Sequence, residues 1–271
     1  MKALILAGGR GKRLRPITDK IPKPLILINN TPLIERSIKY LKKFGINDII
    51  ICSGYKSKQI ENFLKKKRNF NCKIEFSIEK TPLGTAGAIK KATEKISEES
   101  FVVINGDVIT NINLRKILKK PNTIAANELK TKFGTMEIKN SKITAFNEKT
   151  DVEDVWMNPG IYHLSSDIRK ILPKKGSLES QVFPKLAKKN LLFTIKFKNA
   201  LWHSIDSHKD IELCSNDIKS KKYAKILGYN YNSSEWFEQA YKVLNKDYEI
   251  KTKVKPEDND SFFKKIIRKI K

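Results

Sequence analysis

Residues 3–25 read Ala-Leu-Ile-Leu-Ala-Gly-Gly-Arg-Gly-Lys-Arg-Leu-Arg-Pro-Ile-Thr-Asp-Lys-Ile-Pro-Lys-Pro-Leu, and the interpretation of the whole chain starts from them. An apolar run ends at Ala7, and three glycines within four positions and a cluster of cations follow it. Glycines permit positive φ and let bare backbone N–H groups approach a ligand. Such N–H groups, together with clustered guanidinium and ammonium groups, suit a polyphosphate. The stretch therefore predicts a phosphate-binding loop.

Two common phosphate-binding loops do not fit this stretch. The P-loop requires Gly-Lys followed by Ser or Thr, whereas Arg13 follows Gly11-Lys12. The dinucleotide fingerprint requires a third glycine where Leu14 stands, and an acid at the end of the second strand. We expect that strand over residues 48–53, and it closes on Ser-Gly-Tyr without an acid. Both patterns are therefore excluded.

The composition is that of a globular protein with a strong basic excess. The chain has 271 residues, 39% of them hydrophobic, and a net charge of +26. A pI near 9.8 is one mark of nucleic-acid-binding proteins. The basic residues are spread along the whole chain rather than gathered in a stripe, so we expect no specific nucleic-acid partner. Anionic small substrates would still be attracted by the charge.

Hydrophobic segments and cysteines indicate a cytoplasmic protein. No apolar run approaches the roughly 18 residues of a membrane span, so we expect no transmembrane segment. The N-terminus runs directly into an expected strand, and no secretory signal is apparent. The three cysteines are odd in number, scattered and without the spacing of metal ligands, which is typical of a reducing compartment.

Hydrophobic periodicity predicts alternating strands and helices. We expect helices over 31–44 and 56–67, and strands over 48–53, 73–78 and 100–107. This order favours an α/β fold with a doubly wound, mostly parallel, Rossmann-like sheet. Ligands of such sheets bind beyond the carboxyl ends of the strands, where the glycine loop lies.

Two regions follow from the same patterns. We expect a nucleotide-binding catalytic domain over residues 1–215 and a small, basic, helical C-terminal extension over 216–271. Helices are expected over 177–186, 211–227 and 234–244. The pattern of the last ten residues predicts an amphipathic basic helix. Such a helix fits a membrane surface, but we expect it to dock on its own domain or on a neighbouring subunit. We also expect a homo-oligomer.

Asp107 is the first candidate metal ligand. It follows the apolar run 101–104 in the sequence Asn-Gly-Asp, so it would lie at the same sheet edge as the glycine loop. An aspartate at a strand end is usually a cap or turn residue. Magnesium, however, prefers one or two carboxylates together with phosphate oxygens and water, and a strand-end aspartate beside a phosphate loop can supply one of them.

The longest motif resembles a known enzyme family. Residues 8–18 and 23–24 fill the pattern Gly-Gly-x-Gly-x-Arg-Leu-x-Pro-x-Thr followed by Lys-Pro, which is similar to that of the nucleotide-sugar pyrophosphorylases, or sugar-1-phosphate nucleotidyltransferases. Residues 79–87, Glu-Lys-Thr-Pro-Leu-Gly-Thr-Ala-Gly, resemble the nucleotide-base segment of mannose-1-phosphate guanylyltransferases. Residues 202–207 depart from the commonest form, in which Trp is followed by an Asp-Ile-Gly-Thr run, because the acid comes later and Ser207 replaces glycine. That segment is more like glucose-1-phosphate cytidylyltransferases.

The resemblance implies a role for each matching residue. It implies that Arg13, Lys23 and Asp107 are catalytic and that Asp107 and Asp206 hold Mg²⁺. Glu179 fits a sugar contact and an acid in the first turn of a helix about equally well. The implied nucleotide-binding residues are Leu6, Ala7, Gly8, Gly9, Gly11, Arg13, Gly84 and Thr85. The implied sugar-phosphate-binding residues are Gly134, Glu148, Lys149, Asn158 and Gly160.

The implied reaction condenses an NTP with a sugar 1-phosphate to give a nucleotide-diphospho-sugar and pyrophosphate. A mannose-1-phosphate guanylyltransferase-like enzyme is favoured. Thymidylyl or cytidylyl transfer to glucose 1-phosphate, and transfer to a non-sugar phosphate such as phosphocholine, stay open. From other classes, an inactive regulatory homologue that binds nucleotide sugars and a nucleic-acid-binding protein remain as alternatives.

Overall fold

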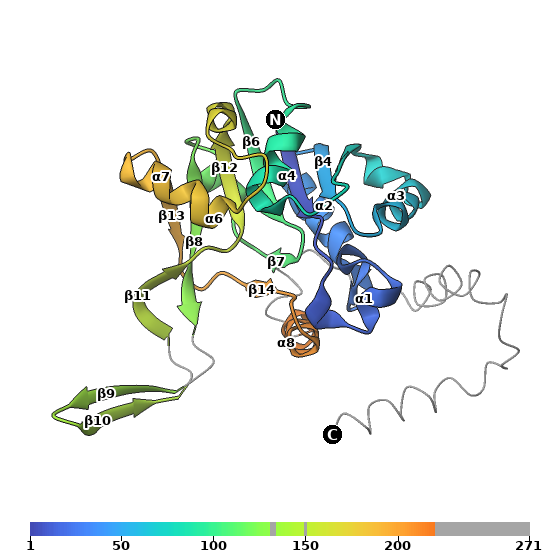
Figure 1. Cartoon of the computed structure of the whole chain (residues 1–271). Coiled ribbons are helices and arrows are strands. Elements are labelled where there is room, and N and C mark those ends of the chain that lie inside the picture. Colours follow the sequence, from blue (N-terminus) through green and yellow to red (C-terminus); the bar gives the residue numbers. More distant parts are fainter. Residues whose placement is uncertain (131–133, 149–150, 220–271) are drawn as a thin grey trace, which may run out of the picture. The chain divides into compact units, whose positions relative to one another are not determined.

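The computed structural model describes residues 1–130, 134–148 and 151–219 (Figure 1). Its centre is an eight-stranded sheet with the strand order β11-β8-β12-β6-β1-β4-β5, in which β13 also pairs with β8. All pairings are parallel except that β12 runs antiparallel to β6 and β8, and β11 antiparallel to β8. The strands are β1 (Lys2–Ala7), β4 (Asp48–Ser53), β5 (Lys73–Ile78), β6 (Ser100–Asn105), β8 (Thr123–Lys130), β11 (Asp151–Met157), β12 (Ile161–Ser165) and β13 (Phe193–Phe197).

The apolar runs of the central strands are buried on both faces of the sheet. On β1, Ile5 packs in one core cluster with helices α2 (Leu33–Lys43) and α3 (Ser57–Lys66). Its neighbour Leu4 packs in a second cluster with α4 (Gly84–Thr93), α6 (Leu178–Gln181) and α7 (Phe183–Lys188). A strand covered on both sides has no polar face, which explains its continuous hydrophobic sequence. The prediction of a doubly wound, mostly parallel fold is confirmed.

The central strands end level with one another. Ala7 of β1 pairs with Ser53 of β4, which pairs in turn with Ile78 of β5. On the other side of β1, Leu6 pairs with Asn105, the last residue of β6. The residues that follow these strands, among them the glycine loop and Asp107, therefore start from one edge of the sheet.

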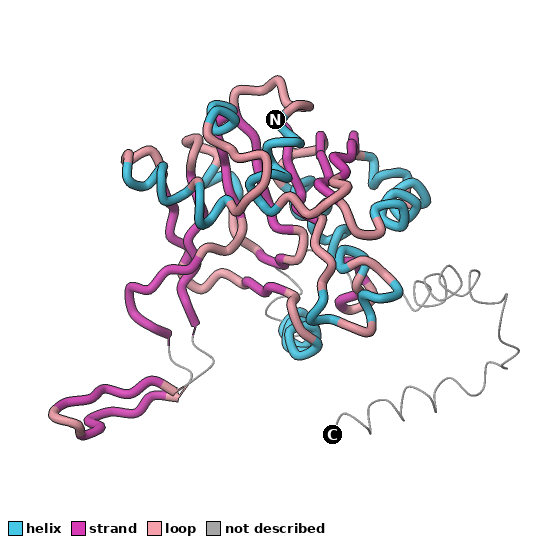
Figure 2. The backbone as a smooth tube through the Cα atoms, in the orientation of Figure 1, coloured by secondary structure: helices cyan, strands magenta, loops and turns pink. Residues whose placement is uncertain are grey.

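Smaller elements surround this edge. Strand β7 (Val108–Thr110) pairs antiparallel with β14 (Trp202–Ser204), and β2 (Leu27–Ile28) pairs with β3 (Thr31–Pro32). A third cluster, with Leu14, Ile28 and Ile205 fully buried, packs helix α8 (His208–Lys219) against this region. Figure 2 shows the short helices and loops that connect them. These short elements are α1 (Ile17–Lys20), α5 (Leu114–Ile117) and the 3₁₀ turns Lys12–Leu14, Lys23–Leu25, Arg68–Asn71 and Ser166–Lys170.

One expected helix is divided. The sequence predicts a single helix over 177–186, but α6 and α7 are separated at Val182. Pro184 lies in the first turn of α7. Its ring nitrogen has no hydrogen, so the bond that a continuous helix would make to the carbonyl of Ser180 cannot form.

Helix α8 begins three residues earlier than the helix expected from 211 and runs through residue 215, where we expected the catalytic domain to end. The remainder of that helix, the helix at 234–244 and the amphipathic end all fall within 220–271, outside the described residues. The domain boundary therefore stays a prediction. Within the described ranges, no helix is both long and apolar enough to cross a membrane.

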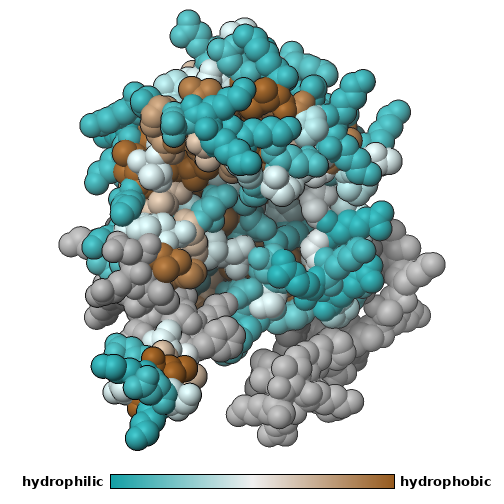
Figure 3. Space-filling model, turned by 60° about the vertical axis from the view of Figure 1, so that its left-hand side comes forward, coloured by the Kyte–Doolittle hydropathy of each residue, from teal (hydrophilic) through white to brown (hydrophobic). Residues whose placement is uncertain are grey.

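A separate hairpin carries exposed apolar side chains. Strands β9 (Thr135–Lys139) and β10 (Lys142–Asn147) pair only with each other within the described residues, and Met136 lies opposite Phe146 and Ile138 opposite Ile143. All four side chains are more than half exposed. In Figure 3 the hydrophobic colour of these side chains stands out on the hairpin against a mostly hydrophilic surface.

Candidate active site

A cavity of about 260 Å³ opens at the sheet edge where β1 and β6 end. Its wall brings together most of the nucleotide, catalytic and metal residues expected from the sequence. The lining residues are Leu6, Ala7, Gly9, Gly11, Lys12, Arg13, Lys23, Pro24, Gly106, Asp107 and Asp206. The phosphate loop, the expected catalytic residues and both expected metal ligands thus face one space.

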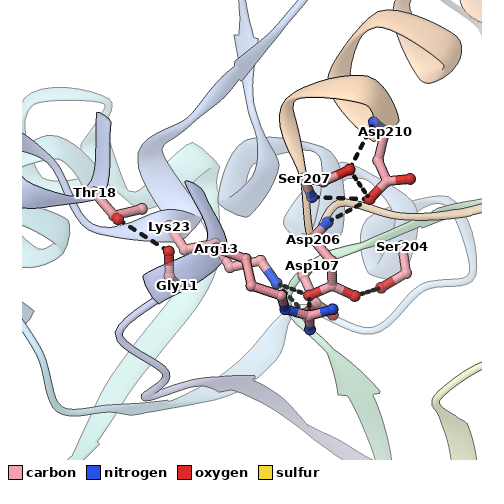
Figure 4. A network of polar contacts seen from close by, with 9 residues as sticks. All are labelled: Gly11, Arg13, Thr18, Lys23, Asp107, Ser204, Asp206, Ser207 and Asp210. Atoms are coloured by element: carbon pink, nitrogen blue, oxygen red, sulfur yellow. Dashed lines mark hydrogen bonds and ion pairs between the residues drawn. The ribbon is translucent and has the colours of Figure 1, made fainter. Parts of the chain in front are cut away.

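The glycine loop is held in a fixed turn. Gly11 has φ +62°, a left-handed conformation that favours glycine, and it starts the 3₁₀ turn Lys12–Leu14. Its carbonyl accepts hydrogen bonds from the backbone N–H of Leu14 at 2.9 Å and from the Thr18 hydroxyl at 3.0 Å (Figure 4). The fully buried Leu14 side chain anchors the turn in the core. The loop therefore presents Arg13 to the cavity from a rigid base.

Two carboxylates converge on one ammonium group in this cavity. Lys23 Nζ lies 2.6 Å from Asp107 Oδ2 and 2.9 Å from Asp206 Oδ1. The guanidinium of Arg13 donates to the same Asp206 oxygen at 2.9 Å (Figure 4). The Lys23 side chain is only 12% exposed, whereas that of Arg13 is 75% exposed. The Arg13 contact is therefore strongly screened by solvent, and the Lys23 contacts are the better shielded ones.

The atypical segment 202–207 does deliver its acid to the site. The β7–β14 pairing sets Ser204 opposite Val108, and the N–H of Ile205 donates to the carbonyl of Asp107 at 3.0 Å. Asp206 thus lies beside Asp107, although the two are 99 positions apart in the sequence. The Ser204 hydroxyl donates to Asp206 Oδ2 at 2.9 Å. The later position of the acid therefore leaves the carboxylate pair intact.

Helix α8 begins at His208, two residues after Asp206, and its first turn fixes the backbone of Asp206. Asp210 Oδ2 accepts hydrogen bonds from the backbone N–H of Asp206 at 3.1 Å and of Ser207 at 2.8 Å. The Ser207 hydroxyl also donates to Asp210 Oδ2 at 2.8 Å, and in return its oxygen accepts from the backbone N–H of Asp210 at 3.3 Å. Reciprocal contacts of this kind between a serine and an acid three residues later form a capping box. The start of α8 is therefore locked next to the candidate metal ligand.

The charge state of Asp206 follows from its neighbours. Its partial burial acts to raise its pKa, because burial disfavours a charge. The hydrogen bond and charge of Lys23, the hydrogen bond from Ser204 and the charge of Arg13 outweigh that effect and lower the pKa below its usual value. Asp206 is therefore a carboxylate at neutral pH.

The carboxylate pair fits a hard divalent cation that also binds phosphate. Within the described residues no group of three or more His, Cys, Asp or Glu gathers as a complete protein cage. Mg²⁺ does not need such a cage, since it usually takes one or two carboxylates and completes its shell with phosphate oxygens and water. Asp107 and Asp206 already share one cation, the Lys23 ammonium, which shows that a positive centre can contact both.

The expected base segment starts helix α4. The backbone carbonyl of Leu83 accepts from Gly176 N–H at 2.8 Å, and Ala86 N–H donates to Gly176 O at 3.0 Å. The hydroxyl of Thr85 donates to Glu179 Oε2 at 2.8 Å. Gly84 and Thr85 therefore lie against the segment that precedes α6, and their contact with a nucleotide stays a prediction.

Glu79 begins the expected base segment, but it is not among the residues to which the resemblance assigned a role. It follows β5 directly, and a Cβ on Gly8 would collide with its Oε1 atom. Its other oxygen, Oε2, accepts from the N–H of Leu83 at 3.0 Å. The signal that could have identified it is the one used for Asp107: an acid placed where a parallel strand ends at the loop edge.

The expected sugar residues lie on two separate elements. Between β11 and β12, Asn158 accepts from the N–H of Gly160 at 2.9 Å and donates to the Tyr162 hydroxyl at 3.0 Å. Tyr162 is also within 3.5 Å of Glu179 Oε1, so Glu179 connects this segment to Thr85. Both interpretations of Glu179 remain compatible with its place in the first turn of α6.

Gly134 and Glu148 lie next to each other at the open end of the β9–β10 hairpin, where a Cβ on Gly134 would be 3.0 Å from Glu148 Oε2. Lys149 lies outside the described residues. Gly134 and Glu148 are not among the residues that line the cavity. The roles of Gly134, Glu148 and Lys149 stay predictions.

Comparison with known proteins identifies the family. The profile of the nucleotidyl transferase family matches residues 2–221. The chain belongs to the nucleotidyl transferase family. It is 38% identical over 195 residues to D-glycero-alpha-D-manno-heptose 1-phosphate guanylyltransferase of Aneurinibacillus thermoaerophilus, covering 68% of this chain and 84% of the relative.

A second relative is the mannose-1-phosphate guanylyltransferase catalytic subunit beta of Xenopus tropicalis, which is 34% identical over 78% of this chain. The match spans 62% of that relative's length. Among solved structures, HddC from Yersinia pseudotuberculosis complexed with GMP-PN has a TM-score of 0.63 and 30% identity, covering 80% of this chain and 99% of HddC. The nucleotidyltransferase family and enzyme class expected from the glycine-loop motif are confirmed.

Proposed function

We propose that this nucleotidyl transferase couples GTP to a sugar 1-phosphate of the mannose or manno-heptose type and releases pyrophosphate. The observation that carries the proposal is the convergence of Lys23, Asp107 and Asp206 on the cavity below the glycine loop. Two phosphorylated substrates need positive charge and a cation site in one place, and the cavity offers both. Relatives named as guanylyltransferases of mannose 1-phosphate and of a manno-heptose 1-phosphate support the choice of substrates.

The reaction needs positioning and charge neutralisation more than covalent help. An oxygen of the sugar phosphate forms a bond to the α-phosphorus of GTP. The bond from that phosphorus to the oxygen bridging to the β-phosphate breaks, and pyrophosphate leaves with the electron pair. Arg13, Gly9 and Gly11 line the cavity, and the arginine side chain and the glycine backbone would hold the leaving pyrophosphate. Lys23 would hold the attacking phosphate, and Lys149 is the expected second contact.

Asp107 and Asp206 would hold Mg²⁺ in this reaction. When bound, the cation supplies positive charge that neutralises phosphate oxygens in the transition state. The role of the protein is to orient both carboxylates. Lys23, Arg13 and Ser204 contact Asp206 and lower its pKa. Asp107 contacts the same ammonium group through Oδ2.

Glu79 supports guanine as the base. Its carboxylate lies at the strand-end edge between Gly8 and the N-terminus of α4, where Oε2 accepts from the N–H of Leu83 and Oε1 lies beside Gly8. The Watson–Crick edge of guanine carries two adjacent donors, the ring N1–H and the 2-amino group, which a carboxylate acceptor complements. Adenine, cytosine and uracil do not present such a pair. A site that hydrogen-bonds a substrate donor discriminates strongly against analogues that lack it.

The reaction class is tested by a substrate matrix. GTP, ATP, CTP, UTP and dTTP are each incubated with mannose 1-phosphate, a manno-heptose 1-phosphate, glucose 1-phosphate and phosphocholine, and products are detected by mass. We expect pyrophosphate and a GDP-sugar from GTP with one of the first two acceptors. A product that carries CDP or dTDP would reassign the substrates. The absence of a product from every combination of nucleotide and acceptor would favour the regulatory homologue.

The base assignment is tested with ITP, which lacks the 2-amino group. Wild type is expected to prefer GTP over ITP, and Glu79→Gln is expected to lower kcat/KM for GTP by about 10-fold to 100-fold, the effect of losing a charge-assisted hydrogen bond. The variant should affect ITP less. An unchanged ratio of GTP to ITP in Glu79→Gln would contradict the assignment of Glu79.

Location and assembly belong to the same proposal. Cys52, Cys72 and Cys214 are all free and buried, which supports a reducing compartment such as the cytoplasm. A homo-oligomer remains an expectation that sedimentation of the full chain would test.

A further inference from the structure

The Asp107–Asp206 pair is occupied by a positive charge that belongs to the chain itself. Lys23 Nζ contacts one oxygen of each carboxylate, at 2.6 and 2.9 Å. The Lys23 side chain is more buried than those of Asp107 and Asp206. The ammonium group thus contacts both of the carboxylates that would hold a divalent cation. The same two oxygens cannot serve Lys23 and a divalent cation in full at the same time.

The charges of the cavity explain why a lysine occupies this place. Two neighbouring carboxylates without a cation repel each other. The Lys23 and Arg13 charges balance those of the two aspartates, which they contact at 2.6–2.9 Å. A divalent cation added to this balanced group would meet the Lys23 charge at close range, so the ammonium must move away for the cation to bind tightly.

The Lys23 side chain can move while its backbone stays in place. Its residue starts the 3₁₀ turn Lys23–Leu25, with the N–H of Leu25 bonded to Pro22 O and that of Ile26 bonded to Lys23 O. Pro22 and Pro24 on either side are buried. The lysine stem passes Gly11, where a Cβ would be 3.2 Å from Lys23 Cβ and 3.5 Å from Cδ. Gly11 therefore leaves space along the stem.

We propose that Lys23 is a built-in substitute for the divalent cation: its ammonium neutralises Asp107 and Asp206 in the cation-free enzyme and competes with the cation for them. The cation that binds must displace Nζ, which is thereby released toward the cavity. The inference rests on the proposed function in taking the aspartate pair as the cation site. It goes beyond that function because it makes a catalytic lysine an inhibitor of cation binding.

The test measures Mn²⁺ binding in the absence of nucleotide and sugar, by electron paramagnetic resonance of free Mn²⁺. Lys23→Met is expected to bind Mn²⁺ at least about tenfold more tightly than wild type, the size of effect that one adjacent charge has on an ionised group. The matched control is Lys12→Met, which removes a lysine from the same cavity wall. Within the described residues Lys12 has no hydrogen bond or ion pair to either aspartate, so its removal should change the affinity by no more than about twofold.

Three further outcomes decide the proposal. Lys23→Arg keeps the charge and should not bind Mn²⁺ more tightly than wild type. Mn²⁺ should raise the melting temperature of Lys23→Met more than that of wild type, because a tighter ligand stabilises the folded state more. Equal tightening in Lys12→Met, or weaker binding in Lys23→Met, would overturn the competition.

The substrate matrix separates this proposal from the proposed function. Activity with GTP and a sugar phosphate but no gain in Mn²⁺ affinity in Lys23→Met would refute only the competition. A gain in affinity in a protein that makes no nucleotide sugar would refute only the reaction. If Lys23→Met does not fold without metal, Lys23→Gln, which retains a polar contact to the aspartates, takes its place with the same expected direction.

Discussion

The hydroxyl of Ser204 donates a hydrogen bond to Asp206 Oδ2 at 2.9 Å, from the last residue of β14 to the acid that precedes α8. Oδ1 of the same carboxylate takes the contacts from Lys23 and Arg13. Both oxygens of Asp206 are therefore oriented, one by a neutral donor on a strand and the other by cations. A partner that orients a metal-binding carboxylate matters almost as much as the carboxylate itself.

Ser204→Ala is expected to raise the Mg²⁺ concentration needed for half-maximal velocity by roughly 10-fold to 100-fold, as is usual for residues that orient metal ligands. Activity at saturating Mg²⁺ should fall less, because Lys23 and Arg13 still contact Oδ1. The measurement is initial velocity against Mg²⁺ concentration. Ser97→Ala is the control, since Ser97 is exposed and lies before β6, at the opposite end of that strand from Asp107.

A Mg²⁺ dependence of Ser204→Ala that matches wild type would show that the hydroxyl does not orient Asp206. A lower melting temperature, together with an activity loss of the same size at every Mg²⁺ concentration, would assign Ser204 a structural role only.

Local patterns were enough to predict the central strands. Strands β4 and β5 cover the residues expected for them, 48–53 and 73–78, because each is an apolar or alternating run with polar residues on both sides. The edge where the site lies followed from one rule, that parallel strands point their carboxyl ends to the same side. Arg13, Lys23 and Asp107 could be placed together in this way.

Contacts between distant segments could not be predicted from local patterns. The Thr85–Glu179 bond joins residues 94 positions apart, and the Lys23–Asp107 bond joins residues 84 apart. Each depends on how loops fold over the sheet edge, for which the sequence carries no periodic signal. The capping box at Ser207 and Asp210 is visible in the sequence, but its effect on Asp206 depends on the β7–β14 pairing.

Gly160 is expected to be intolerant of a side chain. Its φ is +76°, and a Cβ would be 2.5 Å from Asn105 Nδ2. Gly160→Ala combines left-handed backbone strain with a forced shift of Asn105, so we expect it to reduce the free energy of unfolding by about 2–4 kcal/mol. Activity should fall as well, because Asn105 ends β6 two residues before Asp107. Denaturant unfolding and initial velocity measure the two effects.

Gly45 provides a matched control for that substitution. It follows α2 with φ +80°, and a methyl group added there would have no neighbouring atom within 4 Å. Gly45→Ala therefore carries the backbone strain alone, about 1–2 kcal/mol, and should leave activity unchanged. If both alanine variants lose the same stability, the contact between Gly160 and Asn105 is not important.

His163 is expected to make stability depend on pH. It lies on β12 and is 2% exposed. Burial lowers its pKa. The carbonyls of Ile117 and Lys120 accept hydrogen bonds from Nδ1 at 3.2 and 3.0 Å and act to raise the pKa, but burial has the larger effect. Nε2 is buried and has no hydrogen-bond partner among the described residues. A proton on Nε2 would therefore be a buried, unpaired donor.

The sign of the pH effect follows from this lowered pKa. Below the ordinary histidine value of 6.5, the unfolded chain takes up a proton that the folded protein does not. The free energy of unfolding should fall as the pH drops below about 6.5, by at most about 1.4 kcal/mol per pH unit for one group. Above that pH, His163 should have no effect on the pH dependence of stability. His163→Asn keeps a donor near Nδ1 and does not titrate, so urea unfolding at pH 7.5 and 5.5 should show a smaller difference for the variant than for wild type. Parallel pH profiles for the two proteins would show that His163 is protonated as easily in the folded state as in the unfolded chain.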